Sequence, residues 1–461
     1  PPRSTPKPSS AASDVYKRQY LMYEEILRHM LEVWSEKLPP ADLIERGISI
    51  DITDLFTRPR KIVSIVGPRR AGKTYFVFQL YKKLIEGGLN AAYFNFEDER
   101  IENDPIVLSD FLTVLKREYE KNNTYLLLDE IQKISKWDVW IRRIYDTESY
   151  NILITGSTSK LVGFSLPSTL SGRILSILVL PLRFIEFLKF KNVKIDFERA
   201  KASENDKARL ISLLEEYLRY GGLPEVVLAP SYKKVLILQE YYRTIVSRDI
   251  SGGKIRNMEL LDKFLKLMAR SKQVSISKMY NVLKGAGYKV GKGTLVEYLD
   301  KAIEAFFIYT VPVHYESLKA RVQMPKKVYL SDMGYLTAIV PKIDLGRLLE
   351  NAVYLELIRR YWHDPQVEIT YWTDGRREVD FLVKKGKEVI ELIQVSYDIS
   401  DPDTKNREID GLKKAMRRLG IKKGTIITGF QYSRIRELNT IIEIIPYWEW
   451  EQRKQPKYCI W

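Results

Sequence analysis

A glycine-rich stretch that ends in lysine and threonine carries the clearest chemical signal of the sequence. Residues 67–74 read Gly-Pro-Arg-Arg-Ala-Gly-Lys-Thr and follow an apolar, β-branched run at 62–66. This spacing, G-x-x-x-x-G-K-[ST], is typical of a strand that leads into a phosphate-binding loop. The glycines let successive backbone N–H groups face one anion, and a helix that opens at Lys73 adds the positive end of its dipole. The stretch therefore predicts a polyphosphate site; the alternative is a chance loop of the same pattern.

The side chains of this loop have separate expected roles. Lys73 would reach the β- and γ-phosphates, and the hydroxyl of Thr74 would hold a magnesium ion. The expected ligands are therefore ATP and Mg²⁺. The residues expected to contact the nucleotide are Gly67, Pro68, Arg69, Arg70, Ala71, Gly72, Lys73, Thr74 and Tyr75.

An acidic pair follows a second apolar run. Asp129 and Glu130 come directly after Leu-Leu-Leu at 126–128. Asp129 would hold the metal ion through its water shell, and Glu130 would orient or deprotonate the attacking water. Such a pair can also cap a helix, but its place downstream of a phosphate loop favours the catalytic interpretation.

Two further groups could complete a site for phosphoryl transfer. Ser157, or Thr155 in its place, ends another strand-like run and could touch the γ-phosphate or the lytic water. An ordinary exit from a strand is the alternative. Arg173 could serve as a finger that neutralises transition-state charge in a neighbouring subunit, or it could form a surface ion pair.

These groups need a sheet that brings the ends of several strands together. Apolar runs alternate with helical patterns from the phosphate loop onward, and this alternation predicts a parallel sheet of the α/β class. The strand-like runs lie at 62–66, 91–96, 125–128 and 151–156.

The order of the motifs identifies a family resemblance. After the phosphate loop come Leu-Leu-Asp-Glu-Ile-Gln, Ile-Thr-Gly-Ser, Ser-Gly-Arg, Leu-Pro-Leu-Arg-Phe-Ile-Glu-Phe and Tyr-Gly-Gly-Leu-Pro-Glu-Val. This order resembles that of the archaeal and bacterial AAA-type ATPases that carry a C-terminal nuclease-like domain. The similarity runs from about residue 42 to the end of the chain, and it implies that a helical lid follows the P-loop NTPase sheet.

The chain divides into five expected segments. Residues 1–19 resemble translated adaptor sequence and are expected to be a disordered, non-native leader. The remaining segments are a P-loop ATPase α/β domain at 20–183, a helical lid at 184–255, a winged helix-turn-helix at 256–340 and a PD-(D/E)xK nuclease-like (restriction-endonuclease-like) α/β domain at 341–461.

The winged helix is expected from three short helical patterns followed by two strands. The window 251–330 holds 15 Lys and Arg against 6 Asp and Glu, so contact with DNA would be mostly to the phosphate backbone. A packing or protein-contact module is the alternative, because the exposed face of the third helix is mixed or acidic. The residues expected to contact DNA are Lys289, Lys292, Arg321, Lys326 and Lys327.

The last segment is similar to a PD-(D/E)xK nuclease core, in which a helix Glu, a strand Asp and a Glu-x-Lys gather a metal ion and activate water. Glu350 and Asp380 match this pattern, but Gln394-Val395-Ser396 stands where Glu-x-Lys is expected. Glu391 cannot substitute, because strand side chains alternate between faces. We therefore expect a nuclease-like domain without cleavage activity that is retained for nucleic-acid binding or assembly.

Composition agrees with a DNA-associated ATPase. The formal charge of +16 on 461 residues predicts attraction to polyanions such as nucleic acid. A single cysteine, Cys459, excludes an internal disulfide and suits a reducing cytoplasm, and no apolar run approaches the length of a membrane span. The sequence thus predicts a cytoplasmic, homo-oligomeric, Mg²⁺-dependent ATPase; the alternatives are a nucleotide-gated signalling or defence switch that acts on a protein partner, and an active metal-dependent DNA nuclease.

Overall fold

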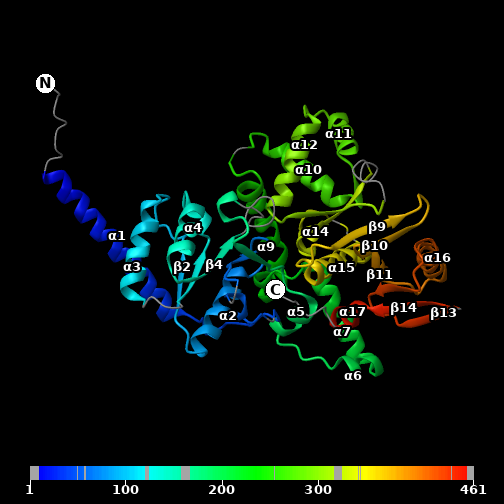
Figure 1. Ribbon diagram of the computed structural model, residues 1–461. Helices are drawn as coiled ribbons and strands as arrows, with labels where there is room; N and C mark the ends of the chain where they lie inside the picture. Colours follow the sequence, from blue (N-terminus) through cyan, green and yellow to red (C-terminus); the bar gives the residue numbers. More distant parts are fainter. Residues whose placement is uncertain are drawn as a thin grey trace. The chain divides into compact units, whose positions relative to one another are not determined.

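The computed structural model of the chain (Figure 1) divides into two compact units. Unit 1 comprises Pro1–Val66 and Lys73–Ile177, and unit 2 comprises Gly67–Gly72 and Leu178–Trp461. The structure describes residues 10–453 except 49, 57–58, 120–123, 157–166, 254, 316–323, 341, 343 and 438.

Unit 1 is organised around a sheet whose five strands, within the described residues, lie in the order β2-β3-β4-β1-β5. The pairs β1/β4, β2/β3 and β3/β4 are parallel, which confirms the predicted α/β sheet. Strands β1 and β3 are buried throughout, as expected for a parallel sheet that is covered on both faces. The strands are β1 (Ile62–Val66), β2 (Ala91–Asn95), β3 (Tyr125–Asp129), β4 (Asn151–Gly156) and β5 (Ile174–Leu178).

The helices of unit 1 include one that begins earlier than expected. Helix α1 starts at Ser10 rather than at Tyr20 and packs against α3 and β2 (Figure 1). The prediction of a disordered leader is therefore wrong for the last ten residues of that segment, where neither proline nor glycine interrupts a helix. The helices are α1 (Ser10–Lys37), α2 (Lys73–Glu86), α3 (Ile106–Glu118) and α4 (Trp137–Thr147), with 3₁₀ turns at Asp54–Phe56, Ile131–Lys133 and Ser168–Leu170.

Unit 2 begins with a helical region that contains the Tyr-Gly-Gly motif. Gly221 has φ +78°, and a Cβ on it would lie 1.6 Å from Oδ1 of Asp332. A Cβ on Gly222 would lie 2.1 Å from a carbonyl oxygen, so close packing explains both glycines. The elements are α5 (Phe184–Phe190), α6 (Phe197–Ala202), α7 (Glu204–Tyr220), α8 (Pro224–Leu228), α9 (Ser231–Thr244) and a π-helical turn at Ile245–Ile250.

The next part of unit 2 contains the three helices and two strands that the sequence predicts between residues 256 and 340, together with a short additional strand, β6, and an additional helix, α14. The strands lie in the order β6-β8-β7 and are antiparallel. The elements are α10 (Met258–Arg270), β6 (Gln273–Val274), α11 (Ile276–Gly285), α12 (Lys292–Glu304), β7 (Ile308–Val311), β8 (Lys326–Leu330) and α14 (Met333–Ile339).

The C-terminal part of unit 2 is a mixed sheet with helices packed on it. The strand order is β13-β14-β12-β11-β10-β9, in which β11, β12 and β14 are parallel. Helix α16 packs on β10, β11 and β12 (Figure 1), and its Leu412 and Met416 belong to one apolar cluster with these strands. The elements are α15 (Leu345–Tyr361), β9 (Val367–Thr373), β10 (Glu378–Lys385), β11 (Glu388–Val395), α16 (Pro402–Leu419), β12 (Lys423–Thr428), β13 (Ser433–Glu437), β14 (Thr440–Pro446) and α17 (Tyr447–Gln452).

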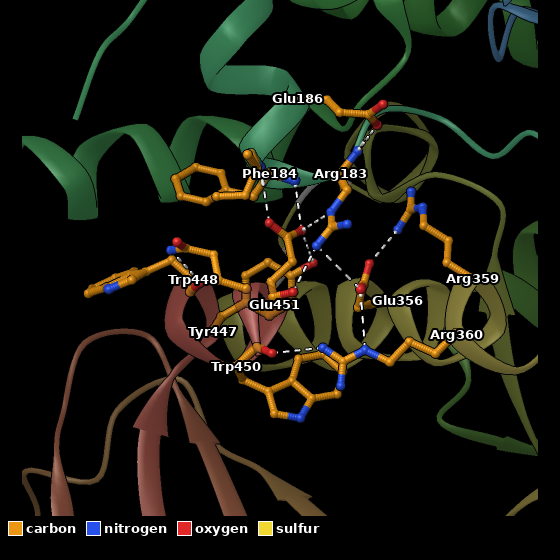
Figure 2. Close-up of polar contacts among 12 residues, drawn as sticks. Arg183, Phe184, Glu186, Glu356, Arg359, Arg360, Tyr447, Trp448, Trp450 and Glu451 are labelled. Carbon is orange, nitrogen blue, oxygen red and sulfur yellow. Dashed lines mark hydrogen bonds and ion pairs between the residues drawn. The ribbon is translucent and has the colours of Figure 1, made fainter. Parts of the chain in front are cut away.

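A buried charge network joins α15 and α17 to the start of α5 (Figure 2). The carboxylate of Glu451 accepts hydrogen bonds from the backbone N–H groups of Phe184 (2.9 Å) and Ile185 (3.0 Å), so it caps α5. Glu356 is fully buried, and its carboxylate lies 3.6 Å from the guanidinium of Arg183. The other members are Arg359, Arg360 and Trp450, whose ring stacks on the Arg360 guanidinium at 3.9 Å. Trp448 and Trp450 are both buried.

Candidate functional site

The phosphate loop connects β1 to α2 and has a left-handed backbone at several positions. Gly67 and Gly72 have φ +147° and +90°, and Arg70 has φ +64°. A Cβ on Gly67 would lie 2.1 Å from the carbonyl oxygen of Val179, so no larger residue fits there. The loop is therefore a tight turn of the kind that can direct backbone N–H groups toward an anion.

Asp129 is the centre of a hydroxyl cluster in unit 1. Its side chain is 2% exposed and accepts hydrogen bonds from the hydroxyls of Thr74 (2.8 Å), Tyr93 (2.8 Å) and Thr155. The cluster forms because β4 lies between β1 and β3, and the carboxyl ends of parallel strands meet at one edge of the sheet. Burial and the negative charge of Asp129 raise the pKa of Tyr93, so its hydroxyl remains a donor.

Glu130 is held beside this cluster in a left-handed conformation, with φ +54°. Its backbone N–H donates to Oγ1 of Thr155 (3.1 Å), and its carboxylate accepts a hydrogen bond from Nε2 of Gln132 (2.5 Å). Thr155 thus fixes the backbone of Glu130 as well as the side chain of Asp129. Neither Gln132 nor Tyr93 is predicted from the sequence to take part in this site.

The oxygen atoms of Thr74 and Asp129 suit a magnesium ion. They are hard ligands, and a magnesium ion at a nucleotide site usually takes one or two protein ligands and completes its shell with phosphates and water. The hydrogen bond between the two side chains places their oxygen atoms side by side, and their role as magnesium ligands stays a prediction. In the described residues no group of three or more His, Cys, Asp or Glu side chains is placed to hold a metal ion.

The other residues predicted for the phosphate site differ in their exposure and in their contacts. Lys73 is the first residue of α2 and is 7% exposed, whereas Tyr75 is 49% exposed. Ser157 lies outside the described residues, but its alternative Thr155 belongs to the hydroxyl cluster. Arg173 lies 3.7 Å from the carboxylate of Asp146, which is the ion-pair alternative; its role as a finger stays a prediction.

The two arginines of the loop have carboxylate partners in unit 2. Arg69 donates two hydrogen bonds of 2.8 Å to Asp249 in the π-helical turn. Arg70 lies 3.7 Å from Glu225, and its guanidinium is 5.1 Å from the ring centre of Tyr241. These partners are far away in the sequence, and no local pattern indicates them.

The expected DNA-contact residues do not share one environment. Lys289 and Lys292 are exposed and Lys326 is half-buried, whereas Arg321 lies outside the described residues. The assignment of Lys327 to a DNA contact is wrong, because its side chain is 3% exposed and its ammonium pairs with Glu350, Glu378 and Asp380. Asp380 also accepts the N–H of Val395, and Gln394 accepts the N–H of Asp380.

None of the described helices combines the length and the apolar character that a membrane span requires.

Three regions of the chain match known families. Residues 59–188 match the AAA_14 family, described as an AAA domain. Residues 211–345 and 345–450 match two domains of unknown function, DUF8612 and DUF4143.

Similar proteins occur in archaea and bacteria. The uncharacterized protein MJ1544 of Methanocaldococcus jannaschii is 34% identical over 441 residues, which cover 93% of this chain and 95% of that protein. An uncharacterized protein of Haemophilus influenzae is 27% identical over 403 residues, which cover 85% of this chain and 93% of that protein. A solved Signal Transduction ATPase with Numerous Domains from Pyrococcus horikoshii, PH0952, has 11% identity and a TM-score of 0.25; the match covers 68% of this chain but 46% of that chain.

Proposed function

Because the chain belongs to the same family as the uncharacterized Methanocaldococcus jannaschii protein MJ1544 and carries an AAA domain, we propose that it binds and hydrolyses ATP with magnesium and transmits its nucleotide state to unit 2. The observation that carries the proposal is the hydrogen bond that the buried carboxylate of Asp129 accepts from the hydroxyl of Thr74, a residue that directly follows the phosphate loop.

Each residue of the site has a part in this reaction. Lys73 and the loop N–H groups bind the phosphates, and Thr74 and Asp129 hold the magnesium ion, which when bound offsets phosphate charge. Glu130 orients the attacking water and accepts its proton, while Gln132 and Thr155 keep Glu130 in position.

The pair formed by Arg69 and Asp249, both in unit 2, supports a response of the π-helical turn to nucleotide. Residues 67–72 of the loop belong to unit 2, whereas Lys73 and Thr74, which follow them directly in the chain, belong to unit 1. A triphosphate bound in the loop would bring negative charge close to Arg69. Its phosphate oxygens would then compete with the carboxylate of Asp249 for the Arg69 guanidinium. Nucleotide binding would in this way loosen the π-helical turn at Ile245–Ile250.

Hydrolysis of ATP by the purified full chain tests the proposal. We expect Mg²⁺-dependent phosphate release that is lost in Lys73→Ala. Lys83→Ala is the matched control, because Lys83 is an exposed residue of the same helix, α2. Glu130→Gln should keep nucleotide binding and lose hydrolysis by about 10²-fold or more. An unchanged rate in Lys73→Ala would refute the assignment.

Contact with DNA through the region of α10 to β8 is a second proposal. The order of three helices and a small antiparallel sheet suits a winged helix, and Lys289, Arg256 and Thr294 line a surface cavity of 510 Å³ near the start of α12. DNA affinity should fall steeply with salt, and Lys289→Gln with Lys292→Gln should reduce the slope of log K against log salt by about 2. A slope that is unchanged in this variant would favour the signalling switch with a protein partner.

A further inference from the structure

Three carboxylates in unit 2 converge on one buried ammonium group. Nζ of Lys327, on β8, lies 2.6 Å from Oδ1 of Asp380, 2.7 Å from Oε1 of Glu378 and 2.9 Å from Oε1 of Glu350. Glu350 comes from α15, and the two other acids come from β10. Carboxylate oxygen atoms are also the ligands that hard cations prefer, but with Lys327 between them these three carboxylates are not placed to hold a metal ion.

We propose that the ammonium of Lys327 is the resident cation of this cluster and occupies the position that a divalent metal ion would need. The cluster of Lys327, Glu350, Glu378 and Asp380, here called the lysine-filled site, is then a structural centre that takes up no metal ion. This proposal does not depend on ATP hydrolysis.

The other polar groups of the lysine-filled site already have partners. Oε1 of Glu350 also accepts the hydroxyl of Tyr329 (2.7 Å), and Oδ2 of Asp380 accepts the backbone N–H of Val395 (2.8 Å). Gln394 accepts the N–H of Asp380 (3.2 Å) and donates from Nε2 to Glu408 (2.6 Å). A metal ion would have to displace the ammonium and break several of these hydrogen bonds.

The charges of the site require a cation at its centre. Burial alone would lower the pKa of Lys327, but the neighbouring carboxylates raise it well above its usual value, so the side chain stays protonated. Burial and the charge of Glu350 raise the pKa of Asp380 to about 7, although Lys327 acts in the opposite direction. If Lys327 were removed, the carboxylates would lack a cation to offset them, and this uncompensated negative charge would favour a divalent ion.

The position of Lys327 also joins two parts of unit 2. Lys327 lies on β8, where its backbone is paired with Gln273 of β6 and Val311 of β7. Gln273 donates from Nε2 to Oε2 of Glu378 (2.5 Å), which reinforces the same connection. The lysine-filled site therefore holds the small sheet against β10 and α15, a role that a metal ion bound to acids alone would not fulfil.

Binding of Mn²⁺ to the nucleotide-free full chain tests the proposal. Electron paramagnetic resonance and thermal unfolding should show the same Mn²⁺ response for the wild type and Asp380→Asn, because the lysine-filled site binds none. Lys327→Ala should gain a Mn²⁺ site with a Kd of about 1 mM or below and a melting temperature that rises with Mn²⁺. Adding Asp380→Asn to Lys327→Ala should abolish this gain, and Lys326→Ala is the matched control that should show none.

Two results would overturn the proposal. The first is that the wild type binds Mn²⁺ and that Asp380→Asn abolishes this binding. The cluster would then be a metal site that binds Mn²⁺ while Lys327 is present. The second is a folded Lys327→Ala that binds no additional Mn²⁺. Lys327→Met keeps most of the buried volume and provides a second variant if the alanine variant does not fold; refolding of either variant by Mn²⁺ supports the proposal.

Discussion

Arg69 and Asp249 form a two-pronged contact, in which Nε and Nη2 of the arginine each donate a hydrogen bond of 2.8 Å to one oxygen of the carboxylate. The Asp249 side chain is 7% exposed and that of Arg69 is 22% exposed, so solvent screens this pair only in part. The contact connects the phosphate loop with the π-helical turn that follows α9.

A double-mutant cycle on this pair should give a coupling free energy of about 1–3 kcal/mol in unfolding experiments with Arg69→Ala and Asp249→Asn. A non-hydrolysable ATP analogue should reduce this coupling, because phosphate competes for the guanidinium. Arg70→Ala is the control: its partner Glu225 is 3.7 Å away, both side chains are more than half exposed, and we expect a loss of less than about 1 kcal/mol. Coupling that is the same with and without the analogue would contradict a nucleotide readout through Arg69.

Tyr93→Phe should weaken the magnesium dependence of hydrolysis and leave the fold intact. The phenyl ring keeps its packing on Trp34 and Phe78, while Asp129 loses one of its hydroxyl donors. We expect the Mg²⁺ concentration for half-maximal ATP hydrolysis to rise by about 10-fold. The measurement is a Mg²⁺ titration at saturating ATP.

Tyr145→Phe is the control for this prediction, because the Tyr145 hydroxyl also donates a hydrogen bond in unit 1, to the carbonyl oxygen of Arg60 (2.6 Å), and Tyr145 lies on α4. An equal shift in both variants would mean that Tyr93 acts through general stability and does not position Asp129.

The sequence predicts the core of unit 1 well, because its signals are local. The loop motif and the acids at the end of β3 sit on parallel strands, and the sheet brings such strand ends together. The role of Tyr93 cannot be predicted in this way, because a tyrosine in a buried apolar run is typical of core packing. Its hydroxyl partner, Asp129, lies on the neighbouring strand, where Tyr93 itself is paired with Leu127.

In unit 2, contacts between residues that are far apart in the sequence could not be predicted. Nothing near Arg69 in the sequence points to Asp249, and Lys326-Lys327 has the appearance of a basic surface pair. Alternation along a strand does offer a signal, because neighbouring side chains face opposite sides of a sheet. Only one of the two lysines could therefore face solvent, and the structure shows that Lys327 is the buried one.

Asp332 should make unit 2 less stable as the pH rises from about 4 to about 7. Burial raises the pKa of Asp332 to about 7, although the N–H groups of Gly222 and Gly334 and the charge of Arg359 favour its ionised form. Above its ordinary pKa the unfolded chain loses the proton while the folded chain keeps it. Stability is thus fully present below about pH 4 and falls by up to about 4 kcal/mol as the pH approaches 7.

The difference in unfolding free energy between the wild type and Asp332→Asn measures this effect, because asparagine does not titrate. The difference should decline between pH 4 and 7. Asp401→Asn is a contrasting control: hydrogen bonds from Thr404 lower the pKa of Asp401, so its contribution should stay constant over the same window. A pH-independent difference for Asp332→Asn would show that this carboxyl is ionised in the folded chain.

Glu451→Gln should destabilise unit 2 more than any exposed charge on the same helix. Its fully buried carboxylate caps α5 and lies 3.8 Å from Nε of Arg183 (Figure 2). Glutamine keeps one hydrogen-bond acceptor but removes the negative charge that offsets the buried guanidinium of Arg183. Breaking a buried ion pair in this way lowers the free energy of unfolding by about 3–5 kcal/mol. Chemical denaturation of the full chain provides the measurement.

Glu449→Gln separates burial from helix effects, because Glu449 lies on α17 as well but is 28% exposed and pairs with Arg453 at 3.7 Å. We expect a loss of about 1 kcal/mol or less for this control. The double variant Arg183→Met with Glu451→Gln should lose less stability than the sum of the two single variants, since it removes both charges from the interior. Additive losses would mean that the Arg183 and Glu451 side chains act independently, with α5 capped by Glu451 and Arg183 stabilised by Glu356 and by the backbone carbonyl of Glu451.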